Sequence, residues 1–345
     1  MDKMLYFCDT PYHVLISILK QYANPCHADM LLARDFPGGY ELVERIAKEN
    51  IFKSVELLTN PVVQDGSSKF MDYFLVKGNC CQSESLKEKL AQYNDLFLFN
   101  DLRKFGFFLN HENIPYHLIE DGFDCFALWD QSKPWGRFAP VKRFLHNAIG
   151  LPVGLGQGPN IIDLEVNDRT RLITPLSCRV IEKRRSELYQ IPNESQVEQL
   201  FRIFDAEPLY SVAHDSCVIL SDPLPELGVT RDDQASVELF LKMAEVIGFD
   251  SCYIKPHPRD CGDYFSCFPK ERVIPSFLPI ELLNFLGKDR IALAATWNST
   301  AIHGLTCCRR KVVFDPNNTD PRVEHMSLMD RHGGSCFDGD DAIRG

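Results

Sequence analysis

Short apolar segments alternate with helix-like segments along most of the chain, and this alternation restricts the fold more than any other feature. Residues 4–8 form a short apolar segment, and residues 12–22 carry apolar side chains at helical spacing. Residues 28–32 and 40–49 repeat the same unit. Strands that alternate with helices form parallel sheets covered by helices on both faces. We therefore predict an α/β fold.

The alternation is interrupted once, which predicts two domains. Residues 151–174 are loop-like, with a glycine-rich stretch followed by short polar segments. A second alternating series starts at residues 217–220 and continues to a strand at residues 290–295. With 345 residues, the chain is long enough for two domains that each have a core of their own. We predict these domains at residues 1–210 and 211–345.

The charge of the chain argues against several classes of partner. Its formal net charge of −11 argues against a nucleic-acid-binding protein and against broad attachment to an anionic membrane. Two basic segments, residues 133–146 and 179–185, leave a local peripheral contact open, although a solvated helix face explains each more simply. No run approaches 18 apolar residues, and the N-terminus lacks the pattern of a signal peptide. We expect a cytoplasmic protein, with peripheral association at the inner membrane face left open.

The thirteen cysteines are scattered and show no metal-site spacing. Cysteines that are adjacent in sequence, such as Cys307 and Cys308, rarely form a disulfide with each other. We therefore expect reduced thiols, as in a cytosol. Pairs of acidic residues at 232–233 and 340–341 lie in polar contexts that do not suit a metal-binding triad. We expect neither a bound metal ion nor a cofactor.

An acidic cluster, Glu120, Asp121 and Gly122, follows the apolar segment at residues 116–119. In open α/β sheets ligands bind at the carboxyl ends of the strands, and Thr10 and Pro11 also follow a predicted strand. Two adjacent acids point in different directions, so one can face a substrate while the other holds the loop. A partly desolvated carboxylate there would act as a general base, and Gly122 permits a backbone conformation that other residues resist. An ordinary acidic turn explains the same residues.

A cationic loop follows the predicted strand at residues 251–254. His257 lies between two prolines, of which Pro258 is the second, and these limit its backbone freedom before a ligand arrives. Protonated, His257 can bond a phosphate oxygen and help a leaving group to depart. Lys255 and Arg259 add positive charge to the loop. A stiff surface loop is an equally simple explanation.

Two hydroxyl residues, Ser299 and Thr300, follow the strand predicted at residues 290–295 in a pattern that resembles a helix cap. The N–H groups and the dipole at a helix N-terminus favour an anion, and the two hydroxyls would help to hold it. Simple capping explains the same residues. Glu281 could hold a ribose, or it could be a solvent-facing helix residue.

The order of these motifs resembles that of the bacterial sialyltransferases, which carry D/E-D/E-G, HP and S-S/T motifs. The first part of the chain, FCDTPYHVLISILK, also resembles the opening strand, loop and helix of glycosyltransferase family 52, the lipooligosaccharide and capsule sialyltransferases. The resemblance implies a GT-B fold, with two Rossmann-like domains facing across a cleft. The N-terminal domain would be the acceptor side and would carry the base. The C-terminal domain would bind the CMP donor.

The resemblance also implies an activity: inverting, metal-independent transfer of sialic acid from CMP-sialic acid to a galactoside hydroxyl of a lipooligosaccharide or capsular glycan. Glu120 matches the position of the family's base, with Asp121 as its neighbour. The family's base usually falls on the first acid, which is Glu rather than Asp in this chain, so the choice between the two stays open. His257 would bind the CMP phosphate and assist its departure.

Other residues take supporting roles by the same resemblance. The phosphate would also be held by Ser299 and Thr300, and the ribose by Glu281. The donor loop would include Lys255 and Pro258. Acceptor contacts are expected from Thr10, Pro11 and Gly122, and from loops at residues 9–13 and 36–40.

Three alternatives remain open. Polysialyltransferases share the motifs. Glycerophosphotransferases of the CDP-glycerol type also use His-Pro motifs and release CMP, but they usually carry a second His-Pro loop, and this chain has one His-Pro pair. Outside enzymes, the chain could be an inactive scaffold that binds a sugar nucleotide. A homodimer is also left open.

Overall fold

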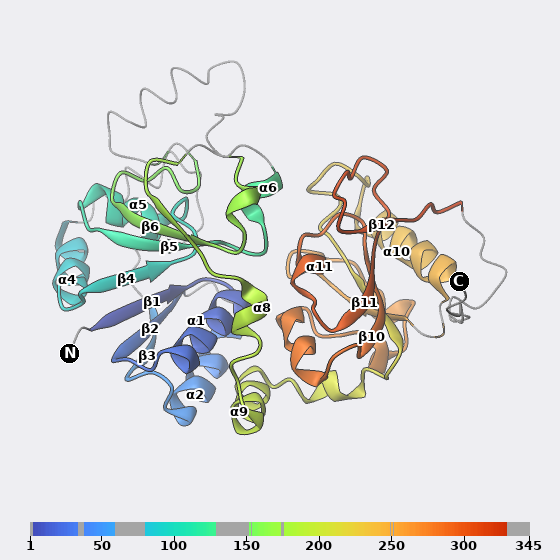
Figure 1. Ribbon diagram of the computed structural model, residues 1–345, viewed down its shortest axis with the longest axis horizontal. Helices are drawn as coiled ribbons and strands as arrows, with labels where there is room; N and C mark the ends of the chain where they lie inside the picture. The colour runs from blue at the N-terminus through green and yellow to red at the C-terminus, as the bar shows by residue number, and fades with distance from the viewer. Residues whose placement is uncertain are drawn as a thin grey trace, which may run out of the picture. The chain divides into compact units, whose positions relative to one another are not determined.

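The computed structural model describes residues 3–33, 38–58, 80–128, 152, 154–173, 176–248, 250 and 252–329 (Figure 1). The chain forms two compact units, Met1–Phe204 and Asp205–Gly345. Each unit contains a parallel β-sheet and helices, which confirms the predicted α/β fold. The predicted boundary between residues 210 and 211 lies inside a 3-10 helix, η3 (Glu207–Ser211). Residues 133–146, 340–341 and part of the loop at 36–40 lie outside the described residues.

The first unit is built on a seven-stranded sheet in the order β3-β2-β1-β4-β5-β6-β7, and all neighbouring strands are parallel. The strands are β1 (Met4–Cys8), β2 (Ala28–Ala33), β3 (Val55–Leu58), β4 (Asp95–Leu98), β5 (Tyr116–Ile119), β6 (Ile161–Val166) and β7 (Arg179–Glu182). Its helices are α1 (Pro11–Ala23), α2 (Gly39–Glu49), α4 (Cys80–Leu90), α5 (Lys104–His111), α6 (Cys125–Leu128), η2 (Arg169–Arg171), α8 (Arg185–Leu188) and α9 (Glu194–Phe204).

Strand β6 lies where the sequence predicts loop-like and short polar segments, and strand β7 lies in the basic segment at residues 179–185, for which a solvated helix face was the simpler expectation. In β6 the last three residues are buried, but Asp163 and Glu165 alternate with the apolar positions. Asp163 lies 2.8 Å from Nδ1 of His117, and Glu165 forms ion pairs with Lys20 and Arg185. The loop prediction was wrong because buried charges interrupt the apolar pattern, and only the tertiary structure supplies their partners.

The second unit has a five-stranded parallel sheet in the order β12-β11-β10-β8-β9. The strands are β8 (Ser216–Leu220), β9 (Cys252–Lys255), β10 (Ile291–Thr296), β11 (Cys308–Val313) and β12 (Glu324–His325). Its helices are α10 (Asp233–Ile247), α11 (Ala301–Gly304), η5 (Tyr264–Ser266), η6 (Lys270–Arg272) and η7 (Ile280–Leu286).

Each sheet has a separate apolar core. The core of the first unit joins strand residues such as Leu5 and Leu118 to Phe105 and Phe108 of α5. The core of the second unit joins Ile219 and other strand residues to apolar side chains of α10. Burial of these side chains provides the main driving force for folding each sheet with its helices.

The strand order reverses at one point in each sheet. In the first unit this point lies between β1 and β4, since the chain builds β2 and β3 on one side of β1 and β4 on the other. In the second unit β9 lies on one side of β8 and β10 on the other. Open α/β sheets bind ligands outside the carboxyl ends of the strands at such points.

Candidate active site

Polar side chains line the carboxyl ends of four neighbouring strands in the first unit. Asp9 follows β1, Asn100 follows β4, Glu120 and Asp121 follow β5, and Asn167 follows β6. The first two of these strands flank the point where the strand order reverses, and β5 lies next to β4. The structure thus brings the predicted acidic cluster to the position where this class of sheet binds ligands.

Asp121 is the partly exposed acid of the pair, with 28% of its side chain accessible. Its Oδ1 lies 2.8 Å from Nε2 of His13, and its Oδ2 accepts a hydrogen bond of 2.6 Å from the side chain of Asn100. Burial alone would raise the pKa of Asp121, but the hydrogen bond and the charge of His13 lower it below its ordinary value. Asp121 is therefore an ionised carboxylate in a fixed orientation.

His13 is the residue of this site that sequence reasoning missed. It lies in the first turn of α1 and is completely buried. Its Nδ1 lies 2.5 Å from a carboxylate oxygen of Asp9. Burial opposes the charged form, but the charges of Asp9 and Asp121 raise the pKa of His13 to about 9. The sequence did contain one indication of its role: His13 lies shortly after a predicted strand, in the loop at residues 9–13 that was expected to contact the acceptor.

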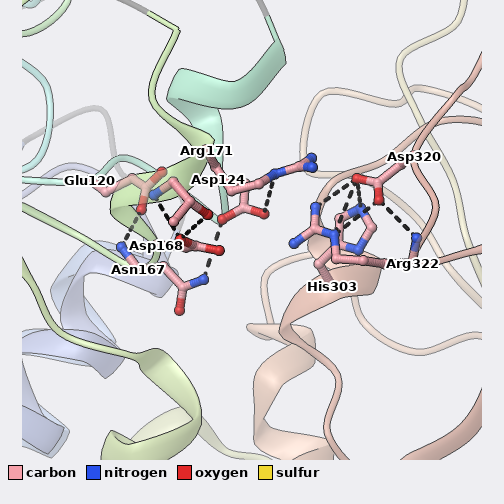
Figure 2. A network of polar contacts seen from close by, with 9 residues as sticks. Glu120, Asp124, Asn167, Asp168, Arg171, His303, Asp320 and Arg322 are labelled. Atoms are coloured by element: carbon pink, nitrogen blue, oxygen red, sulfur yellow. Dashed lines mark hydrogen bonds and ion pairs between the residues drawn. The ribbon is translucent and has the colours of Figure 1, made fainter.

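Glu120 is 2% exposed and turns into the protein instead (Figure 2). One carboxylate oxygen accepts a 2.8 Å hydrogen bond from the backbone N–H of Asn167, whose side chain in turn donates to Asp124 at 3.3 Å. Burial raises the pKa of Glu120 to about 7, and the nearby Arg185 limits the rise. The two acids therefore differ in their contacts. Glu120 links β5 to the loop after β6 by a hydrogen bond, whereas Asp121 remains accessible.

Thr10, Pro11 and Gly122 shape the loops around these acids. Thr10 is the N-cap of α1, and its hydroxyl oxygen accepts a 3.3 Å hydrogen bond from the backbone N–H of His13. Pro11 occupies the first helical position, where its missing N–H costs nothing. Gly122 has a φ of +84°, and the space around its Cα is open, so the bend after Asp121 requires glycine on backbone grounds.

The basic segment at residues 179–185 is not the solvated helix face that was the simpler expectation. It runs from the strand β7 into α8. Lys183 and Arg185 both pair with Glu165, and Arg185 is fully buried. Arg185 is thus an interior ion-pair partner, whereas Arg179, Lys183 and Arg184 are exposed.

In the second unit, the two residues after β8 connect the loops that carry the predicted donor site. The hydroxyl of Ser221 accepts a 2.9 Å hydrogen bond from the backbone N–H of His257. Asp222 is buried and accepts a 3.0 Å hydrogen bond from the backbone N–H of Asn298, next to Ser299. Because β8 lies between β9 and β10, the His257 loop and the Ser299 loop meet at one end of this sheet. Ser221 and Asp222 were not singled out from the sequence, and the signal was a strand, CVIL, that ends in Ser-Asp-Pro.

His257 is held as a neutral ring with a defined tautomer. Its Nδ1 accepts a 3.1 Å hydrogen bond from the backbone N–H of Arg259, which leaves the proton on Nε2. Burial lowers the pKa of His257 to about 4, and the charges of Arg259 and Lys255 act in the same direction. His257 therefore offers a neutral N–H donor in this structure, and its role at a phosphate stays a prediction. The neighbouring Pro258 is exposed.

Lys255 and Glu281 are buried near each other beneath this loop. The ammonium group of Lys255 donates to the backbone carbonyls of Pro256 and Ser276, at 2.9 and 3.0 Å. Burial lowers the pKa of Lys255 to about 8 and raises that of Glu281 to about 7, and each group partly offsets the shift of the other. Glu281 is 5% exposed, so it is not a solvent-facing helix residue.

Ser299 and Thr300 precede α11, which has only four residues. The predicted helix dipole is therefore weak, because the macrodipole arises from several aligned turns. The backbone N–H of Ser299 donates to the hydroxyl of Thr296 at 3.0 Å, and the side chain of Thr300 caps no N–H of the helix. Hydroxyls and loop amides, rather than a long helix, are the groups that this segment offers to an anion.

The segment after Thr300 is anchored by a second polar group (Figure 2). The carboxylate of Asp320 lies 3.5 Å from Nε2 of His303 in α11, and 2.7 Å from the guanidinium of Arg322. The hydrogen bond and the charge of Arg322 hold the pKa of Asp320 far below its usual range. This group fixes α11, and therefore the end of the loop that carries Ser299.

Within the described part of the chain, no three His, Cys, Asp or Glu side chains form a group that could hold a metal ion. The metal-independent reaction stays a prediction. Among the described helices, none combines the length and the apolar character needed to cross a bilayer.

Comparison with known proteins identifies the family. The model of glycosyltransferase family 52 matches residues 48–314, which is well over half of the chain. The chain belongs to glycosyltransferase family 52. The predicted family is thereby confirmed, and so is the coarse activity of a glycosyltransferase.

The chain is also similar to solved structures and to a sequence relative. The spinosyn forosaminyltransferase SpnP is similar with a TM-score of 0.50 and 11% identity, over 91% of this chain and 80% of that chain. LpCGTa in complex with UDP gives a TM-score of 0.47 and 10% identity, over 91% and 79%. An uncharacterized protein of Haemophilus influenzae is 21% identical over 256 residues, covering 73% of this chain and 75% of the relative. The family 52 chain thus has the predicted GT-B architecture of two Rossmann-like domains.

Proposed function

We propose that this glycosyltransferase moves sialic acid from CMP-sialic acid to a galactoside hydroxyl of a lipooligosaccharide or capsular glycan, with inversion and without a metal ion. The observation that carries the donor assignment is the tautomer of His257. A neutral ring whose Nε2–H is fixed by the Arg259 amide can donate one hydrogen bond to one phosphate. A nucleoside diphosphate would present a second phosphate that this one donor cannot reach at the same time, whereas CMP leaves with a single phosphate.

The donor site combines that N–H group with two hydroxyls. In our proposal the phosphate of CMP accepts hydrogen bonds from Nε2 of His257 and from Ser299 and Thr300. The bond from the anomeric carbon to the phosphate oxygen breaks, and the leaving CMP keeps the electron pair. Fixed donors aimed at the developing negative charge stabilise this step because they need no reorganisation. In the same proposal Glu281 holds the ribose. The charge of the buried Lys255 lowers the pKa of Glu281 and so favours its carboxylate form.

We propose Asp121, rather than Glu120, as the general base. Asp121 is the partly exposed acid, whereas Glu120 is buried and bonded to a backbone amide. The acceptor oxygen forms its bond to the anomeric carbon, and its proton passes to Asp121. A carboxylate of low pKa is sufficient, because the attacking hydroxyl becomes strongly acidic once it bonds to a centre with oxocarbenium character. In this proposal the protein works in the cytoplasm, with peripheral association at the inner membrane face left open.

The proposal is tested with the purified full chain, CMP-sialic acid and lactose, with and without EDTA. CMP is quantified by chromatography and the glycan product by mass spectrometry. We expect equal amounts of CMP and sialyllactose, unchanged by the chelator. If neither lactose nor N-acetyllactosamine yields product, the assignment fails, and CDP-glycerol and sialylated acceptors then test the two rival transferases. Product that needs a divalent ion would overturn the metal-independent part alone.

A further inference from the structure

His13 lies between two carboxylates at the point where the strand order of the first sheet reverses. Its Nε2 is 2.8 Å from Asp121, and its Nδ1 is 2.5 Å from Asp9. The backbone N–H of Asp9 also lies 3.4 Å from Nδ1, but the carboxylate oxygen is much closer and is the main partner. An imidazole with both nitrogens directed at carboxylates matches them best when both nitrogens carry a proton.

His13 has no access to a substrate. Its side chain is 0% exposed, and its ring is stacked on Phe99 with a centroid distance of 4.1 Å and an angle of 5° between the planes. The more exposed of its two carboxylate partners is Asp121, at 28% against 12% for Asp9. Any influence of His13 on a reaction must therefore pass through a carboxylate, and chiefly through Asp121.

The charges around His13 come from three elements. Asp9 precedes α1, Asp121 follows β5, and Arg103 caps α5 with its Nε 3.7 Å from Asp9. Tyr12 presents its ring edge-on at 6.1 Å, and Asn100 adds a neutral donor to Asp121. The environment of the imidazole is dominated by the two carboxylates, which favour its charged form.

We propose that His13 is a permanently charged positioning residue, which fixes the Asp121 carboxylate in one orientation and keeps it ionised for the transfer reaction. This inference rests on the proposed role of Asp121 as base. The proton balance is simple: the acceptor hydroxyl gives its proton to Asp121, His13 keeps both of its protons throughout, and Asp121 later releases its proton to solvent. Two constraints on the carboxylate, from His13 and Asn100, leave the remaining lone pairs of Asp121 for the acceptor.

The same sheet contains a matched control, His117. Its Nδ1 lies 2.8 Å from Asp163 and its Nε2 lies 3.2 Å from Asp95, and its ring stacks on Phe97 at 4.8 Å. This second arrangement lies at the amino ends of β4, β5 and β6, the opposite end of the strands from Asp121. A histidine between two aspartates is thus present twice, once beside the proposed base and once remote from it.

The first measurement needs no substrate. Side-chain NMR of ¹⁵N-histidine and ¹³C-aspartate follows the titration of both groups in the full chain, in wild type, His13→Gln and His117→Gln. We expect His13 to carry both protons at pH 7.5, and Asp121 to titrate about one pH unit or more higher in His13→Gln, because a neutral amide replaces the cation. His117→Gln should leave the titration of Asp121 unchanged. A singly protonated His13 at pH 7.5 overturns the proposal, even if His13→Gln does not fold.

The second measurement is the pH profile of kcat/KM for transfer. In His13→Gln we expect its acid limb to move up with the pKa of Asp121, and kcat to fall with the donor KM unchanged. A purely structural role would lower activity at every pH, as in His117→Gln, and leave the limb in place. An unmoved limb in an active His13→Gln variant overturns the proposal. Absence of transfer by the wild type refutes the proposed function, and the NMR titration still decides the state of His13.

Discussion

His13 and His257 each follow a parallel strand at its carboxyl end, yet the first unit favours a charged imidazole and the second a neutral one. His13 is enclosed by the carboxylates of Asp9 and Asp121, and its pKa rises to about 9. His257 is enclosed by backbone and lies near Arg259 and Lys255, and its pKa falls to about 4. Both rings are largely withdrawn from water, which by itself disfavours the cation in both units. The difference therefore comes from the sign of the neighbouring charges.

This contrast separates two uses of one side chain. A charged imidazole can hold a carboxylate in place and in its ionised form, which suits the side of the reaction that removes a proton. A neutral imidazole with a fixed N–H can donate to a phosphate without a strong, salt-sensitive charge. In the second unit, the ammonium group of Lys255 also adds no direct charge contact to a phosphate, because it donates to backbone carbonyls.

The largest effect is expected at the acids of the first unit. Asp121→Asn should lower kcat for transfer by about 10²- to 10⁴-fold, the usual contribution of a general base. Glu120→Gln keeps an oxygen for the Asn167 amide, so it should cost less than about tenfold, the scale of one hydrogen bond. Steady-state kinetics with CMP release as the readout measures both. The reverse order of the two losses would return the base to Glu120.

Glu120→Gln should also change the pH dependence of the protein's stability. The folded pKa of Glu120, about 7, lies above that of an unfolded glutamate, so its stabilising effect is complete at low pH and is lost as pH rises through 7. Urea unfolding at pH 6 and pH 8.5 should therefore show that Glu120→Gln gains stability over wild type at the higher pH. If the difference in unfolding free energy between Glu120→Gln and wild type is the same at both pH values, Glu120 is already ionised at pH 6.

A smaller effect is expected when the neutral histidine is removed. His257→Gln should weaken CMP binding by about tenfold, as for a hydrogen bond to a charged group. A bound phosphate dianion raises the pKa of His257 above 4, so CMP binding to the wild type should take up protons and tighten as pH falls toward 5. Calorimetry in two buffers with different ionisation enthalpies measures this uptake. The exposed His214 is the control, and proton uptake that survives in His257→Gln would contradict the assignment.

The smallest effect is expected at Ser221, which acts only on the position of the His257 loop. Ser221→Ala removes the acceptor of the His257 amide and the hydroxyl bonded to Asp260, which should cost about 1 kcal/mol of stability per hydrogen bond. We expect transfer to fall by less than about tenfold, with the pH dependence of CMP binding retained. Ser266→Ala, which removes an exposed hydroxyl of the same unit, serves as a control. A loss as large as that of His257→Gln would mean that Ser221 contacts the donor itself.

Much of the fold was predictable from local patterns. Alternating apolar strands and helical segments identified β1, α1, β8, α10 and β10, because strands buried on both faces appear as short apolar runs and helices as apolar residues at helical spacing. The strands β6 and β7 escaped because Asp163, Glu165 and Arg179 break that signal. Charged residues inside a strand are stable only with partners from distant parts of the chain, and such partners have no periodicity to detect.

The sequence by itself determined the motif residues, their order and their place at strand ends, and with them the family and the GT-B class. Local chemistry suffices for that, since strand ends and turn residues are encoded within a few positions. Only the tertiary structure decided which acid is accessible, that His13 lies beside Asp121, and which histidine carries charge. Those properties depend on burial and on charges contributed by other strands, as with Asp121, which is 108 positions from His13 in the chain and 2.8 Å from it in the fold.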